Sequence, residues 1–217
     1  MSFFDRRQNM LDGQIRPWGV SDVKVLNAVN EVPRELFVPP RYKEVAYADI
    51  SIPLNEQQNM LEPKTIAKAI QELNIISSDR VLEIGSGTGY ATAVLSKLAN
   101  EVTSLEIDKD LYAIAKNNLN NFGLNNNIKL INVDAFDYED SKPFDAVFIS
   151  ASMLKLYSNF LTQLKVEGKM FAIVGSNAFQ EATIFTKKAN NQLHRHVIFD
   201  TLADRIVASG SNNNFHF

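Results

Sequence analysis

Residues 81–90, Val-Leu-Glu-Ile-Gly-Ser-Gly-Thr-Gly-Tyr, join an apolar strand to a helical pattern through glycines at 85, 87 and 89. A strand turns this tightly into a helix, with its backbone close to a ligand, only where side chains are absent. The first turn of the helix then offers N–H groups that no other backbone group uses. The segment therefore predicts a ligand-binding loop of the nucleotide type.

The spacing of the glycines indicates which ligand the loop binds. A dinucleotide site has the pattern G-x-G-x-x-G, but its third glycine falls at position 90, which is Tyr90. Glu83 precedes the loop, and its carboxylate favours a cationic ligand such as the aminoacyl-sulfonium part of S-adenosylmethionine. Glu106 ends the next predicted strand about twenty residues further on, the distance at which a carboxylate meets ribose hydroxyls. The alternative is a bare strand-to-helix turn followed by a solvated glutamate.

Composition limits the partners of the chain. It has 217 residues and a net charge of −3, and its basic residues are scattered, so we expect one ordinary globular unit that does not bind nucleic acid. No apolar run is long enough to cross a membrane and residues 1–7 do not form a secretion signal, so we expect a cytoplasmic protein. Cysteine is absent, which excludes thiol chemistry. His194 and His196 share one face of a predicted edge strand without a third ligand, so no metal site is expected.

The chain divides at about residue 76. Residues 1–76 are predicted to form a mostly helical lobe that covers the substrate and cofactor, and residues 77–217 the binding domain. One helix of the lobe is expected to be capped by Ser21 and to end before Pro33. A second begins at Pro63 and carries apolar residues at helical spacing.

From residue 80 onward, strands and helices alternate. Strands are expected at 81–84, 102–106, 128–133, 146–149 and 170–174, and helices at 91–98, 110–119 and 156–164, with a break at Gly168. A helix over 179–188, a strand over 193–202 and a short strand over 205–208 follow, and Asn212–Asn214 are predicted to lie in a frayed tail. This order predicts an α/β fold, a Rossmann-like doubly wound sheet, with the ligand at the carboxyl ends of the strands.

Several segments together resemble one family. They are Val32-Pro-Arg-Glu-Leu-Phe-Val-Pro39, Ala46-Tyr-Ala-Asp49, Ile52-Pro-Leu54 and the glycine motif of 81–90, in this order and spacing. They are similar to the protein-L-isoaspartate O-methyltransferase family, whose members use S-adenosylmethionine to methylate isoaspartyl residues of damaged proteins and release S-adenosylhomocysteine. The resemblance covers nearly the whole chain. It implies a seven-stranded methyltransferase sheet in which the order of the last two strands can be exchanged.

The resemblance also implies roles for individual residues. The methionine part of the cofactor would lie against Gly85, Ser86, Gly87 and Gly89, with Glu83 near its amino end. Glu106 would take the ribose hydroxyls and Ile107 would lie against the adenine. Asp134 and Ala135 would meet the adenine amino edge.

One segment departs from the family pattern. Where the family has Gly-x-Gly-Gln-Thr-Ile-Ser-x-Pro, this chain has Asn55-Glu-Gln-Gln-Asn-Met-Leu-Glu-Pro63. Gln58 fits, but the active-site serine of the family is replaced by Leu61, which cannot donate a hydrogen bond to a substrate carboxylate. The catalytic residue is therefore unassigned, and Gln58 and Asn59 are the candidates for holding the substrate, with Asn59 also the candidate replacement donor.

Three functions follow from these observations. The first is carboxyl methylation of isoaspartyl residues, which needs no base because a carboxylate acceptor is already ionised at neutral pH. The second is a methyltransferase of the same scaffold with a different acceptor, as the altered loop allows. The third is a non-catalytic S-adenosylmethionine-binding module.

Overall fold

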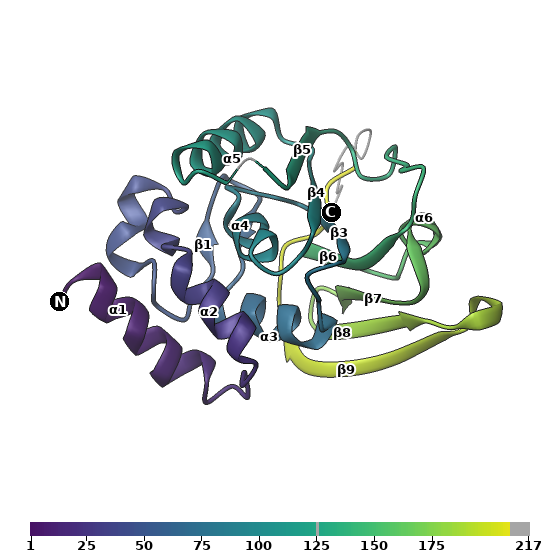
Figure 1. Cartoon of the computed structure of the whole chain (residues 1–217), viewed down its shortest axis with the longest axis horizontal. Coiled ribbons are helices and arrows are strands. Elements are labelled where there is room, and N and C mark those ends of the chain that lie inside the picture. Colours follow the sequence, from purple (N-terminus) through teal and green to yellow (C-terminus); the bar gives the residue numbers. More distant parts are fainter. Residues whose placement is uncertain (125, 209–217) are drawn as a thin grey trace.

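The computed structural model describes residues 1–124 and 126–208, and its centre is a seven-stranded sheet (Figure 1). The strand order is β5-β4-β3-β6-β7-β8-β9. The strands span Ile128–Asn132 (β5), Glu101–Glu106 (β4), Arg80–Ile84 (β3), Phe144–Met153 (β6), Leu164–Gly175 (β7), Gln180–Lys187 (β8) and Leu193–Thr201 (β9). The first five strands are parallel, and β8 and β9 add an antiparallel hairpin in chain order. The predicted α/β fold with a doubly wound sheet is confirmed.

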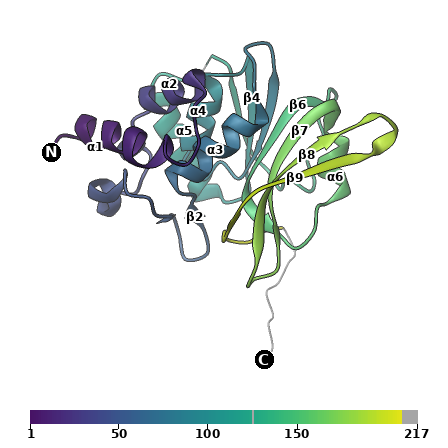
Figure 2. The ribbon, with the colours of Figure 1, turned by 90° about the horizontal axis from the view of Figure 1, so that it is seen from below.

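The chain before the sheet is mostly helical and lies to one side of it (Figure 2). It contains α1 (Phe3–Met10), a π-helical turn (Leu11–Ile15), α2 (Val23–Glu31), two 3₁₀ turns (Arg34–Leu36 and Pro40–Val45), the short pair β1 (Ile52–Pro53) and β2 (Asn59–Met60), and α3 (Pro63–Leu73). The expected cap of α2 at Ser21 is wrong. Asp22 is the cap, because its carboxylate accepts from the backbone N–H of Lys24.

Residues alternate along the central strands between two buried faces. On β6, Ala146 and Phe148 pack into a core shared with α2, α3 and α4 (Tyr90–Ser96), whereas Val147 and Ile149 pack into a second core on the opposite face. The second core is closed by α6 (Ser158–Thr162), while α5 (Lys109–Asn121) places Leu119 in the first. The core that holds the N-terminal helices is thus continuous with one face of the sheet.

The helix expected over 179–188 is wrong, because this segment is the strand β8. Its sequence contains Thr183, Ile184 and Phe185, whose side chains suit a pleated surface, and it pairs antiparallel with β7 on one side and β9 on the other. Hydrogen bonding to both neighbours outweighs the helical preference of Gln180 and Glu181 at its start.

Three smaller expectations also differ. Gly168 does not break the chain but lies inside β7, where a Cβ atom would come within 2.9 Å of the Asp145 carbonyl oxygen. The helix expected over 156–164 is shortened to α6. The strand expected over 205–208 is reduced to one bridge between Arg205 and Ser152. The stretch Asn212–Asn214 lies outside the described residues.

Candidate active site

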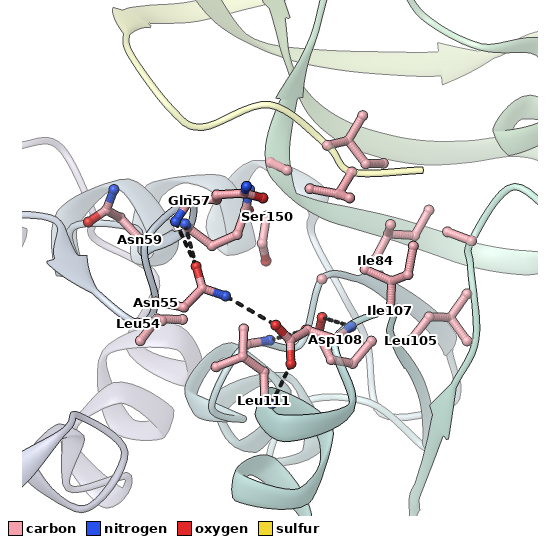
Figure 3. Close-up of a pocket in the computed structure, with 18 of the residues that line it drawn as sticks. Leu54, Asn55, Gln57, Asn59, Ile84, Leu105, Ile107, Asp108, Leu111 and Ser150 are labelled. Carbon is pink, nitrogen blue, oxygen red and sulfur yellow. Dashed lines mark hydrogen bonds between the residues drawn. The ribbon is translucent and has the colours of Figure 1, made fainter. Parts of the chain in front are cut away.

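A pocket of about 280 Å³ lies at the carboxyl ends of β3, β4 and β5, where the sequence placed the ligand (Figure 3). Strand β3 lies between β4 and β6, so the order of the strands in the sheet reverses at β3. Such a reversal leaves a crevice at the carboxyl ends of the strands. The pocket is lined by Leu54, Asn55, Gln57, Gln58, Asn59, Ile84, Gly85, Gly87, Leu105, Glu106, Ile107, Asp108, Leu111, Val133, Ala135, Ser150, Ala151, Ile206 and Val207.

The glycine loop forms one wall of this pocket. Gly85 and Gly87 have φ values of +87° and +55°, which favour glycine, and both line the pocket. A Cβ atom on Gly87 would come within 2.9 Å of the Leu54 side chain, so the missing side chain keeps the two walls close. Ser86 faces a smaller neighbouring cavity instead.

Gly89 has a different surrounding from the other two glycines. It begins α4 with a φ of +92° and does not line the pocket. A Cβ atom there would come within 3.2 Å of the Leu119 side chain. The structure therefore gives Gly89 a packing position between α4 and α5.

Glu106 is the buried carboxylate of the pocket. Its Oε2 accepts from the backbone N–H of Gly87 at 2.7 Å, and its Oε1 accepts from that of Asp108 at 3.0 Å. Burial raises the pKa of Glu106, and these backbone hydrogen bonds counteract the rise. Oε2 also accepts a long hydrogen bond from the Ser86 hydroxyl at 3.5 Å. A carboxylate oxygen can accept two hydrogen bonds, so Oε1 can accept from a ligand hydroxyl at this wall.

Glu83 lies behind the glycine loop, outside the lining of the main pocket. Its Oε2 accepts from the hydroxyls of Thr92 at 2.5 Å and Ser104 at 2.6 Å, which connects α4 to β4. Its Oε1 has no hydrogen-bond partner among the described residues. Full burial raises the pKa of Glu83 to about 7.

The far wall is apolar. Ile107 and Ala135 line it together with Leu105 and Val133. Asp134 is buried beside this wall, and its Oδ1 accepts from the backbone N–H of Phe136 at 2.9 Å, which fixes the turn after β5.

The wall opposite the glycine loop joins two distant parts of the chain. Asn59 donates its backbone N–H and its Nδ2 to Oδ2 of Asp204, at 2.6 and 2.8 Å. Gln58 donates its Nε2 to the Arg205 carbonyl oxygen at 3.1 Å. Asn55 donates its Nδ2 to Oδ2 of Asp108 at 3.2 Å, as the dashed line in Figure 3 shows. Gln58 and Asn59 both line the pocket, and no sequence motif indicates Asp204 or Arg205 as their partners.

Leu61 is buried next to this wall. Its side chain lines a cavity of about 40 Å³ with Asn59, Gly87 and Tyr90, and also an open pocket of about 310 Å³ with Asp204. The residue at the position of the family serine therefore lies between the glycine loop and the C-terminal segment.

Across residues 1–124 and 126–208, no three His, Asp or Glu side chains gather in a way that could hold a metal ion. Within the same ranges, no helix has the length and apolar character needed to span a membrane.

A mostly parallel sheet with a glycine loop after its central strand β3 and an acid at the end of β4 is typical of nucleotide-binding α/β proteins. The family model for protein-L-isoaspartate(D-aspartate) O-methyltransferase matches residues 5–206, and the chain belongs to this family. The protein-L-isoaspartate O-methyltransferase of Methanoregula boonei is 36% identical over 184 residues, which cover 84% of each chain. That of Koribacter versatilis is also 36% identical, over 84% of this chain and 82% of its own.

A solved structure shows the same fold. The crystal structure described as a protein-L-isoaspartate O-methyltransferase from Plasmodium falciparum, in complex with S-adenosyl-L-homocysteine, superposes with a TM-score of 0.80. It is 22% identical, and the match covers 92% of this chain and 97% of that one.

Proposed function

We propose that this chain transfers a methyl group from S-adenosylmethionine to the carboxylate of isoaspartyl residues in proteins. Family membership over residues 5–206 supports the reaction class. The observation that carries the proposal is the pocket formed by the glycine loop and Glu106, because it joins a backbone cradle to a buried carboxylate at the edge of the sheet.

The residues of the pocket fit this cofactor. Gly85 and Gly87 line the pocket without a side chain, so a ligand can approach their backbone, and Glu106 presents an acceptor for ribose hydroxyls. The apolar wall of Ile107 and Ala135 suits the faces of an adenine ring. In this assignment Ser86 and Gly89 shape the loop, Asp134 fixes the turn beside the adenine, and Glu83 holds the loop from behind.

When bound, S-adenosylmethionine supplies an activated methyl group on a positively charged sulfur. The protein then has to hold the acceptor in line with the methyl group and exclude water. Leu54 and the segment 55–59 close the pocket opposite the glycine loop, and the hydrogen bonds of Asn59 to Asp204 fix this wall. We propose that residues 1–76 act as the cover, since they supply this segment. No general base is required for a carboxylate acceptor.

A second candidate is the same methyl transfer to a different acceptor. It is favoured by the buried Leu61, which presents no hydroxyl to a carboxylate acceptor. The Nδ2 of Asn59 already donates to Asp204, so one of its two amide hydrogens is not available to a substrate.

Labelled S-adenosylmethionine with a matched pair of peptides tests the proposal. One peptide contains an isoaspartyl residue and the other an ordinary aspartyl residue at the same position. We expect label in the isoaspartyl peptide only. Label in neither peptide, with label in another component of a cell extract, would reject the isoaspartyl acceptor and support the second candidate. Label in no acceptor, together with S-adenosylhomocysteine binding in a calorimeter, would indicate a non-catalytic module.

A further inference from the structure

Arg34 is a fully buried arginine that the function proposed above does not use. It begins the 3₁₀ turn Arg34–Leu36 inside the motif Val-Pro-Arg-Glu-Leu, and its side chain has 0% exposure. Its Nη2 donates to the Leu61 carbonyl oxygen at 2.8 Å. Its Nε and Nη1 have no hydrogen-bond partner within the described ranges. A buried charge with so few partners is costly to keep, which indicates that its position serves a purpose.

The guanidinium also lies over the ring of Tyr90, the residue that follows the glycine loop. Its central carbon lies 4.7 Å from the centre of the Tyr90 ring, and Tyr90 is the first residue of α4, directly after Gly89. Burial lowers the pKa of Arg34, while Tyr90 and the carboxylate of Glu62 raise it. An arginine retains its charge under these conditions, because its ordinary pKa is far above neutrality.

Arg34 therefore contacts both walls of the reaction site at once. Leu61 belongs to the segment opposite the glycine loop, and Tyr90 follows the loop itself. Both residues line the same narrow cavity of about 40 Å³, which Gly87 and Asn59 also line. A displacement of Leu61 relative to Tyr90 would change the distance between the two walls.

We propose that Arg34 is a positioning residue for methyl transfer: it sets the distance of the acceptor segment 59–61 from the glycine loop through its simultaneous contacts with Leu61 and Tyr90. The inference rests on the proposed methyltransferase function. Misplacement of reacting groups by about 1 Å reduces rates by roughly a hundredfold, so a loss of this bridge is expected to lower kcat more than cofactor binding.

Two variants of Arg34 and two of a matched surface arginine test the proposal. Lysine in Arg34→Lys can still donate to the Leu61 carbonyl but lacks the planar group that stacks on Tyr90, and Arg34→Met loses both contacts. Arg41 is the control, because it stacks on Tyr42 at 4.8 Å but is exposed and contacts neither wall. Arg41→Lys and Arg41→Met should therefore behave as the unaltered protein.

Three quantities are measured for each variant: kcat on the isoaspartyl peptide, the Kd of S-adenosylhomocysteine, and the hydrogen exchange rate of backbone amides in residues 59–62. We expect kcat to fall about tenfold in Arg34→Lys and further in Arg34→Met, with Kd changed by less than about twofold. Exchange should accelerate in residues 59–62 and stay unchanged in residues 91–96. Melting temperature and far-UV circular dichroism identify any variant that fails to fold.

The outcomes separate this inference from the proposed function. Unchanged exchange in residues 59–62 of a folded Arg34→Lys protein, or a Kd that rises in parallel with the loss of kcat, would overturn the positioning role. If the unaltered protein methylates no isoaspartyl peptide, the proposed function fails, and the exchange rates of residues 59–62 still decide the role of Arg34.

Discussion

The glycine-loop wall of the pocket, taken together with the acid Glu106 and the apolar residues beside it, comes from one continuous stretch of chain, residues 84–108, whereas the opposite wall joins residues 54–61 to residues 203–207. In the first wall, Glu106 accepts from Gly87 and from Asp108, so its contacts are set by adjacent strands of a parallel sheet. In the second wall, Asn59 and Asp204 meet across 145 positions of sequence and belong to no common strand pair.

The two walls differ in rigidity, and this difference suits them to different roles. The first wall is built on β3 and β4, which are buried on both faces, and such elements hold side chains more rigidly than loops do. The second wall is a loop held by a few polar contacts, which can change without disturbing the sheet. We infer that the first wall binds the cofactor and that the second selects the acceptor.

Substitution of Glu83 is expected to give the largest effect, a change in the free energy of unfolding, and it tests what holds the first wall in place. Its pKa of about 7 in the folded protein lies above its ordinary value of 4.5, so the buried carboxyl favours its protonated form. Its contribution to stability is complete below pH 4.5 and is lost as the pH rises through 7, a loss on the order of 2–4 kcal/mol. Glu83→Gln should therefore show a flatter pH dependence of urea unfolding than the unaltered protein and be the more stable of the two at pH 8.

The control for this measurement is Glu139→Gln, since Glu139 is exposed. It should retain the pH dependence of the unaltered protein. If the stability curves of Glu83→Gln and the unaltered protein are parallel between pH 5 and 8, ionisation of Glu83 does not destabilise the folded protein.

Glu106 tests whether the first wall binds the ribose. Glu106→Ala should weaken S-adenosylhomocysteine binding by roughly 1.5–3 kcal/mol, the range of hydrogen bonds to charged groups, and Asp134→Ala should weaken it less. Glu106→Gln keeps the shape of the side chain and should give an intermediate value. Asp110→Ala is the control, because Asp110 is an exposed acid of α5 outside the pocket lining. Calorimetric titrations that give equal affinities for Glu106→Ala and Asp110→Ala would remove Glu106 from the cofactor site.

Substitution of Leu61 tests whether the second wall contacts the acceptor, and we expect a smaller effect, on kcat. If the acceptor is an isoaspartyl carboxylate, Leu61→Ser should raise kcat on the isoaspartyl peptide up to about tenfold, because a hydroxyl adds one hydrogen bond to a charged group. Leu61→Ala, which removes the same bulk without adding a donor, is the matched control. An equal rate for the serine and alanine variants would show that the hydroxyl has no role here.

The two walls also differ in how far the sequence could predict them. Gly85, Gly87 and Glu106 lie close together in the chain, and their spacing alone indicated a cradle and an acid at one sheet edge. The same spacing could not place Glu83 behind the loop or Gly89 against Leu119, because the pattern records proximity in sequence and not the direction of a side chain.

The second wall was predictable only in part. The family pattern marked Gln58, Asn59 and Leu61 as a departure, but Asp204 follows no motif and reaches Asn59 only after the sheet has formed. The strand β8 was missed for a similar reason, since its Gln-Glu-Ala start is compatible with a helix and its pairing with β7 and β9 decides its conformation.

Asp204→Ala tests the separation of the two walls most directly, with Asp200→Ala on the exposed part of β9 as the control. The Kd of S-adenosylhomocysteine and kcat on the isoaspartyl peptide are measured on the same preparation of each protein. We predict that Asp204→Ala lowers kcat about tenfold, because Asn59 loses the partner that fixes it, and changes Kd by less than about twofold. A Kd that weakens as much as kcat falls would contradict a cofactor wall and an acceptor wall that act separately.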